Sequence, residues 1–146
     1  MTVEKFPSVV GDIMSHPVST VDEDTLVKDV AELMTSRGIG SVIITQGGVP
    51  KGIVTKRDII QRLVTKCGDP CQHKAGAIMS SPLITTQKDN GILNAMRKMR
   101  EKAITQIVVM DGFEMVGIVS ERDMIRAVSI SSLASFTTLL GKKTPT

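Results

Sequence analysis

The chain contains one segment twice. Residues 76–129 repeat residues 11–64 at a constant offset of 65 residues, with no gap needed. The opening GDIMSHP matches GAIMSSP, and the closing GIVTKRDII matches GIVSERDMI. A duplication with a fixed period decides the architecture, because it predicts one unit built twice. The chain is therefore expected to be a paired unit whose function lies between its two copies.

Each copy contains an amphipathic helix near its start. Apolar residues recur at helical spacing in residues 26–34 and again in residues 92–99. Gly38 is expected to end the first helix, whereas Ala103 stands at the matching position of the second. The residues expected to cap the two helices are Asp24 or Thr25 and Asn90.

The second half of each copy has the pattern of a hairpin followed by a helix. Two short segments rich in Val and Ile are joined by a turn containing Gly, which predicts hairpins over 41–54 and 106–119. A last helix is expected over 57–66 and over 122–129. Each copy therefore reads as β-α-β-β-α, and the fold class is α/β.

The repeats set the expected domain boundaries. The first repeat with its N-terminal extension covers residues 1–66, and a polar linker that contains Pro70 covers residues 67–74. The second repeat covers residues 75–129. Residues 130–146 are expected to form a helical tail, because apolar residues recur there at roughly helical spacing.

Composition narrows the class of protein. Hydrophobic residues make up 41% of the chain, but only three residues are aromatic, all of them Phe, so Val, Ile, Leu and Met must build the core. No apolar stretch is long enough to span a bilayer, and no signal sequence opens the chain, so a cytoplasmic protein without membrane association is expected.

Two cysteines lie in the linker, in the sequence KCGDPCQHK. Cys67 and Cys71 with His73 offer at most three ligands on a short loop, whereas a closed structural zinc site needs four. An ordinary linker with incidental thiols is therefore preferred, and no metal site is expected.

The closing motif carries the chemistry that points to a ligand. Thr55 and Ser120 are placed at the start of the last helix of each copy, where unpaired N–H groups favour phosphate. Their hydroxyls can donate to phosphate oxygens, and Arg57 and Arg122 add positive charge.

The acidic residues of the same motif suit a sugar. Asp58 and Asp123 would repel phosphate, but they can accept hydrogen bonds from a pair of sugar hydroxyls, and a nearby glycine lets a ligand approach closely. Hydroxyl, arginine and aspartate together indicate a ribonucleotide. The alternative is a capping box, in which the aspartate bonds back to the start of its own helix. The residues alone leave both interpretations open.

From about Gly11 to Ser129 the chain resembles a tandem pair of CBS domains, the regulatory module named after cystathionine β-synthase. The resemblance rests on IMS-x-P, the middle helix and GIV-[ST]-x-x-D, each present twice in order. It implies two repeats packed sheet to sheet about a pseudo-twofold axis, with adenine nucleotides bound in the clefts between them. It also implies a homodimer.

The resemblance places the ribose contact on the aspartates, the phosphate contact on the hydroxyls, and the base contact on the loops before the middle helices. The strand-entry positions, where some relatives carry a basic pair, are neutral here, which favours a monophosphate over a triphosphate. The expected ligand-binding residues are Val18, Thr20, Gly52, Ile53, Thr55, Lys56, Arg57, Asp58, Leu83, Thr85, Gly117, Ile118, Ser120, Arg122 and Asp123.

The resulting function is that of an energy-sensing regulatory module that binds AMP or another adenine nucleotide and signals to an unidentified partner protein. No catalytic residues and no required cofactor are expected, because neither histidine is paired with a nucleophile. The alternative is a nucleic-acid binder, indicated by a pI of about 9.0. Its basic cluster would be Arg97, Lys98, Arg100 and Lys102.

Overall fold

The structure, a computed structural model, describes residues 6–130. The chain divides into two compact units. The first-sheet unit is Pro17–Ile84, and the second-sheet unit joins Met1–His16 to Thr85–Thr146. The predicted tail, residues 130–146, lies outside the described residues except for its first residue.

Both units contain a three-stranded sheet whose order follows the chain. In the first-sheet unit, β1 is parallel to β2, and β2 forms an antiparallel hairpin with β3. The elements of this unit are β1 (Thr20–Asp22), α1 (Val27–Arg37), β2 (Ser41–Gln46), β3 (Val49–Thr55), α2 (Lys56–Arg62), the 3₁₀ turn η2 (Val64–Lys66) and α3 (Ala75–Ile78).

The second-sheet unit repeats this arrangement, and its register matches that of the first. Its elements are the 3₁₀ turn η1 (Val10–Asp12), β4 (Thr85–Gln87), α4 (Ile92–Lys102), β5 (Gln106–Asp111) and β6 (Glu114–Ser120), followed by helical residues 121–130. The α/β class and the order of elements predicted from the repeat are confirmed.

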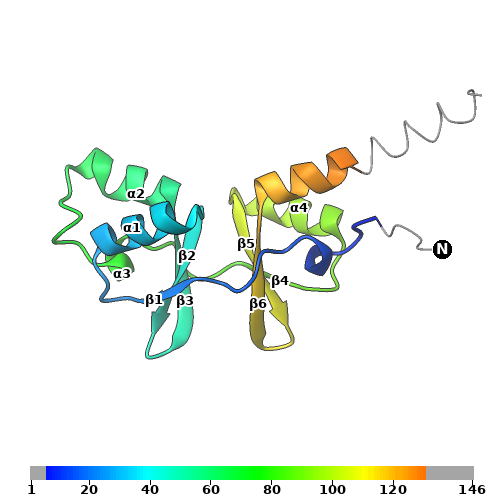
Figure 1. The fold of residues 1–146 in the computed structure, drawn as a ribbon, viewed down its shortest axis with the longest axis horizontal. Helices are drawn as coiled ribbons and strands as arrows, with labels where there is room; N and C mark the ends of the chain where they lie inside the picture. The colour runs from blue at the N-terminus through cyan, green and yellow to red at the C-terminus, as the bar shows by residue number, and fades with distance from the viewer. Residues whose placement is uncertain (1–5, 131–146) are drawn as a thin grey trace, which may run out of the picture. The chain divides into compact units, whose positions relative to one another are not determined.

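In each unit the helices lie on one face of the sheet (Figure 1). Val42 and Ile44, two residues apart on β2, point to the same face and pack with Val30 and Met34 of α1. All four side chains are nearly inaccessible to solvent. The apolar stripe predicted for α1 is therefore the side of the helix that covers the sheet.

The opening segment of each repeat lies in the unit that contains the sheet of the other repeat. These exchanged segments are residues 11–16 of the first repeat and residues 76–84 of the second. Ser80, from the start of the second repeat, pairs with Ile53 on β3 in the first-sheet unit. Ser15, from the start of the first repeat, pairs with Ile118 on β6 in the second-sheet unit. Each compact unit is thus completed by the opening segment of the other sequence repeat, which the duplication alone did not predict.

Residues that come just before the exchanged segments cap the main helices. The N–H groups of Val27 and Lys28, at the start of α1, donate to the carbonyl oxygens of His73 and Pro70 at 2.9 and 3.0 Å. At the start of α4, the N–H of Ile92 donates to Ser8 at 3.2 Å. Backbone carbonyls from distant residues thus satisfy the orphan donors of both helices.

The predicted side-chain caps are wrong for this reason. The N-cap residues are Leu26 and Gly91, and neither makes a side-chain capping bond. Asn90, one of the predicted caps, instead donates to the hydroxyl of Thr86 at 2.9 Å.

The ends of the helices show one confirmed expectation and one difference. Gly38 ends α1 in the left-handed conformation at φ 62°, as predicted, and Ala103 adopts the same conformation at φ 52° after α4.

The predicted helix over 57–66 is interrupted at Leu63, where φ is −116°. Leu63 is buried in the core of the unit, and η2 continues the chain as a separate turn.

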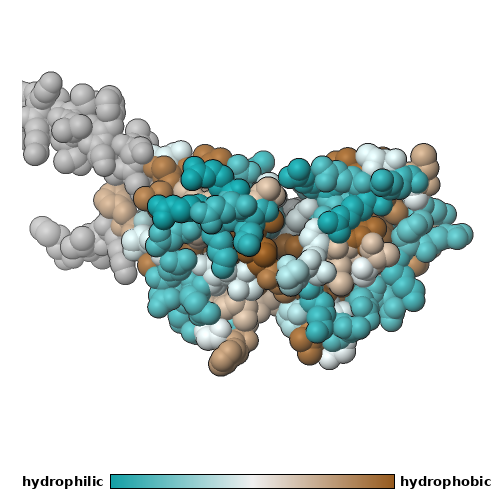
Figure 2. Space-filling model, turned by 180° about the vertical axis from the view of Figure 1, so that it is seen from behind, coloured by the Kyte–Doolittle hydropathy of each residue, from teal (hydrophilic) through white to brown (hydrophobic). Residues whose placement is uncertain are grey.

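The surface is mainly hydrophilic with separate apolar patches, as one face of the molecule shows (Figure 2). Among the described residues, no helix is long and apolar enough to cross a membrane. Exposed apolar side chains include Ile60 and Ile125, which occupy matching positions in the two repeats and are 56% and 54% exposed.

Candidate functional site

The predicted site residues of the first-sheet unit gather at one edge of its sheet. Thr55, at the end of β3, pairs with Ser41, at the start of β2. The segment before β1 reaches the same edge, because the carbonyl of Ser19 accepts from the N–H of Ile43 at 2.9 Å. The loop with Val18 and the closing motif with Thr55 are therefore neighbours on this edge.

The second-sheet unit has the corresponding edge. Ser120 pairs with Gln106, and the N–H of Glu121 donates to Thr105 at 2.9 Å. Thr85, at the start of β4, accepts a hydrogen bond at its carbonyl from Nζ of Lys98 at 2.5 Å. The predicted partner of Thr85 in base binding, Leu83, belongs to the first-sheet unit.

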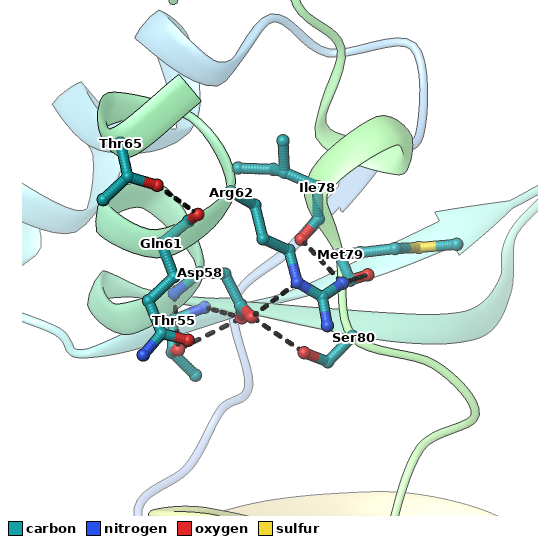
Figure 3. Close-up of polar contacts among 8 residues, drawn as sticks. All are labelled: Thr55, Asp58, Gln61, Arg62, Thr65, Ile78, Met79 and Ser80. Carbon is teal, nitrogen blue, oxygen red and sulfur yellow. Dashed lines mark hydrogen bonds and ion pairs between the residues drawn. The ribbon is translucent and has the colours of Figure 1, made fainter. Parts of the chain in front are cut away.

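Asp58 is the centre of a polar cluster in the first-sheet unit (Figure 3). Its Oδ2 accepts from the N–H of Thr55 at 2.8 Å and from the Thr55 hydroxyl at 3.1 Å. Its Oδ1 accepts from the hydroxyl of Ser80 at 2.8 Å and lies 3.8 Å from Nε of Arg62. The residue is only 8% exposed, so these partners enclose the carboxylate almost completely.

The same cluster fastens the exchanged segment to α2. Nη1 of Arg62 donates to the carbonyl of Met79 at 2.7 Å, and Ser80 is held by Asp58 (Figure 3). Hydrogen bonds to a charged group contribute about 1.5–3 kcal/mol each. The ion pair between Arg62 and Asp58 contributes less, because the Arg62 side chain is half exposed and solvent screens its charge. Asp58 is therefore a major attachment point for this segment.

Asp123 has fewer partners in the second-sheet unit. Its Oδ2 accepts from the N–H of Ser120 at 2.9 Å, and its own N–H donates to the Ser120 hydroxyl at 3.1 Å. The positions that match Ser80 and Arg62 hold Ser15 and Ala127. Within residues 6–130, no other hydrogen bond or ion pair involves the Asp123 carboxylate.

Both closing motifs form the capping arrangement that the sequence left open. Thr55 and Asp58 exchange hydrogen bonds across the first turn of α2, and Ser120 and Asp123 do the same at the start of helix 121–130. The capping interpretation is confirmed at both positions. Nucleotide binding by the same residues is a separate matter, because a carboxylate can accept more than one hydrogen bond.

The glycines of the motif lie against side chains and backbone of the exchanged segments. A Cβ at Gly52 would lie 2.6 Å from Sδ of Met79 and 2.8 Å from the carbonyl of Ser80. A Cβ at Gly117 would lie 2.5 Å from Sδ of Met14. The exchanged segments thus make the close approach that glycine permits. A contact of Gly52 and Gly117 with a ligand stays a prediction.

Ile53 and Ile118, which follow the glycines, have their main-chain groups paired with Ser80 and Ser15 of the exchanged segments. The basic residues of the motifs are available to solvent instead. Lys56, Arg57 and Arg122 are all exposed. At the second-sheet edge the groups accessible to a ligand are therefore the hydroxyl, arginine and carboxylate side chains, whereas at the first-sheet edge the Asp58 carboxylate is enclosed.

The linker cysteines do not form part of a metal site in the described structure. Cys67 and Cys71 are exposed free thiols, and Nδ1 of His73 lies 2.8 Å from the carbonyl of Asp69. Over residues 6–130, no group of three or more His, Cys, Asp or Glu side chains could hold a metal ion.

Sequence reasoning missed three residues that shape the two edges: Ser80, Arg62 and Lys98. Arg62 and Lys98 could have been found by asking where the repeats differ. Arg62 is matched by Ala127, and Lys98 by Leu33, which packs against the core of the first-sheet unit. Ser80 is matched by Ser15, so only the structure reveals that it contacts Asp58.

Comparison with known proteins identifies the repeats. The CBS domain family model matches residues 10–65 and 75–130. The CBS domain-containing protein YhcV of Bacillus subtilis is 30% identical over 117 residues, which cover 80% of this chain and 83% of that protein. The uncharacterized protein MK0525 of Methanopyrus kandleri is 32% identical over 119 residues. That match covers 80% of this chain but only 61% of the Methanopyrus protein.

Solved structures of other proteins have the same fold. A putative signal-transduction protein with CBS domains from Burkholderia ambifaria superposes with a TM-score of 0.77 at 24% identity, over 84% of this chain and 93% of that chain. The hexameric CBS-CP12 protein from bloom-forming cyanobacteria superposes with a TM-score of 0.75 at 25% identity, over 80% of this chain and 69% of that chain.

Proposed function

Because this chain belongs to the CBS domain family, we propose that it is a regulatory module that binds an adenine nucleotide, with AMP the preferred ligand. Proteins of this family are generally regulatory or ligand-binding. The nucleotide occupies the sheet edge formed by the closing motif. Whether the nucleotide is bound is signalled to a partner protein. The module catalyses no reaction of its own and needs no cofactor.

One observation carries this proposal: a hydroxyl, an arginine and an aspartate stand together at a sheet edge. In the second-sheet unit these residues are Ser120, Arg122 and Asp123. A guanidinium and a hydroxyl suit phosphate oxygens, and a carboxylate suits the paired hydroxyls of ribose. A single phosphate matches the modest charge of this edge better than a triphosphate.

We expect titration calorimetry to detect AMP binding to the full chain. A nucleotide that binds only the folded state stabilises it by about 2.7 kcal/mol at 100 times its dissociation constant, so the Tm should rise by several degrees. Inorganic phosphate and GMP are the controls, since neither offers both the adenine base and the ribose phosphate. Neither heat nor a Tm shift with AMP, ADP or ATP would contradict the proposal.

The nucleic-acid alternative has less support. In the basic cluster of α4, Lys98 directs its amine to the carbonyl of Thr85, and few aromatic residues are available to stack on bases. Binding to nucleic acid would weaken steeply as salt rises, because it depends on neutralised phosphates. The same calorimetry with a single-stranded oligonucleotide at low and high salt separates the two functions.

We further propose that two copies of the chain associate into a homodimer. Ile60 on α2 and Ile125 in helix 121–130 are more than half exposed, and exposed apolar side chains on the last helix of each repeat offer contacts for self-association. The cyanobacterial CBS-CP12 protein is itself described as hexameric. Light scattering should give twice the mass of one chain. The double substitution Ile60→Asp and Ile125→Asp should reduce the measured mass to that of a single chain. A monomeric mass for the unmodified chain would rule the dimer out.

A further inference from the structure

The two aspartates of the closing motifs differ in how much bonding capacity they have left. An ionised carboxylate offers about four lone-pair sites on its two oxygens. Asp58 accepts three hydrogen bonds, two from Thr55 and one from Ser80, and Nε of Arg62 lies 3.8 Å from its Oδ1. Asp123 uses one for the N–H of Ser120. Its Oδ1 has no hydrogen-bond partner among the residues that the structure describes.

The two hydroxyls differ in the same sense. The hydroxyl of Thr55 accepts from the N–H of Asp58 at 3.3 Å and donates its proton to Oδ2 of Asp58 at 3.1 Å. The hydroxyl of Ser120 accepts from the N–H of Asp123, but it donates to no group within residues 6–130. At the second-sheet edge both an acceptor and a donor are thus available to a ligand.

This difference follows from the sequence. Ala127 stands where Arg62 stands in the first repeat, so the cation that pairs with Asp58 has no counterpart at that position of helix 121–130. Ser15, which matches Ser80, is exposed and makes no side-chain hydrogen bond to a described residue. A ligand that used Asp58 would have to displace Ser80 or Arg62, which would loosen the exchanged segment. A ligand that used Asp123 would displace neither counterpart.

We infer that the chain has one nucleotide site, on the second-sheet unit, and that Asp58 is a structural residue. In this site Asp123 accepts from the ribose hydroxyls, Ser120 donates to the phosphate and Arg122 pairs with its charge. Nucleotide binding therefore resides in one closing motif, although the sequence carries two. The inference rests on the proposed function, because it assigns the position and number of the sites that function requires.

Titration calorimetry with AMP on the full chain tests the inference through matched variants. The unmodified chain should bind one nucleotide per chain. Asp123→Asn keeps an acceptor for the Ser120 N–H but loses the charged acceptor for ribose, so binding should weaken about tenfold or more. Asp58→Asn should bind one nucleotide with an affinity within about threefold of the unmodified chain.

A second matched pair avoids the buried cluster, in case Asp58→Asn folds poorly. Arg57 and Arg122 are both exposed and occupy matching positions, so their replacement should leave folding intact. Arg122→Ala should weaken AMP binding, and Arg57→Ala should not. Two sites per chain, or equal losses from the members of a pair, would overturn the inference while the proposed function stands. No binding to the unmodified chain would overturn both.

Discussion

Asp58→Ala is expected to lower the free energy of unfolding by about 3 kcal/mol, whereas Asp123→Ala lowers it by about 1 kcal/mol. Both substitutions remove a capping bond. Only Asp58→Ala also removes the acceptor of the Ser80 hydroxyl and the carboxylate beside Arg62. Because Asp58 is buried, the groups it leaves behind cannot all be satisfied by water. Urea denaturation of the two variants measures the difference.

Ser80→Ala is the control for this result. It removes one partner of Asp58 and leaves the capping bonds from Thr55 in place, so a loss of about 1 kcal/mol is expected. Equal losses for Asp58→Ala and Asp123→Ala would show that the contacts to Ser80 and Arg62 contribute nothing to stability. The assignment of Asp58 as a structural residue would then be wrong.

Fragments of similar length should differ sharply in their ability to fold. A fragment of residues 17–84 contains the whole first-sheet unit, including α3 and Ser80. A fragment of residues 1–66 contains the first sequence repeat but lacks the carbonyls of Pro70 and His73 that cap α1. Circular dichroism should show helix and a cooperative thermal transition for 17–84, and a largely unfolded chain for 1–66.

A substitution within the longer fragment supplies the control. Ile78 on α3 is 2% exposed and packs in the core of the first-sheet unit, so Ile78→Asp buries an unpaired charge. This change should abolish the thermal transition of the 17–84 fragment. If 1–66 folds as well as 17–84, the exchanged segment is dispensable for the first sheet.

Much of the fold could be predicted because the relevant signals are local. The Val- and Ile-rich segments around the turns at Gly47-Gly48 and Gly112 gave both hairpins, and the apolar stripe of α1 gave its buried face. Gly38 marked the end of α1 because a left-handed residue is needed there. Because the two repeats align without a gap, a helix or hairpin predicted in one repeat could also be predicted at the matching residues of the other.

The exchange of the opening segments could not be predicted in this way. Ser15 and Ser80 precede matching elements, and no periodicity shows which of the two sheets each segment joins. The caps failed for the same reason, since the groups that bond the N–H groups of Val27 and Ile92 are backbone carbonyls of residues far along the chain. A carbonyl is present at every position, so it leaves no trace in the sequence.

The candidate site shows a similar division. Sequence alone identified Thr55, Asp58, Ser120 and Asp123 as residues that act together, and the structure places them at helix starts on two sheet edges. The difference between the two aspartates depends on Arg62 and Ala127, a contrast that the aligned repeats contain. The sequence does not show that Arg62 contacts both Asp58 and the exchanged segment, so the structure is needed to interpret this difference.

A crystal structure of the full chain grown with AMP tests the central claim most directly. The account predicts one nucleotide per chain, with the ribose hydroxyls within hydrogen-bond distance of Oδ1 of Asp123 and the phosphate beside Ser120 and Arg122. The Ser80–Asp58 hydrogen bond should be intact in the same crystal. A nucleotide bound by Asp58, with Ser80 displaced, would contradict the account.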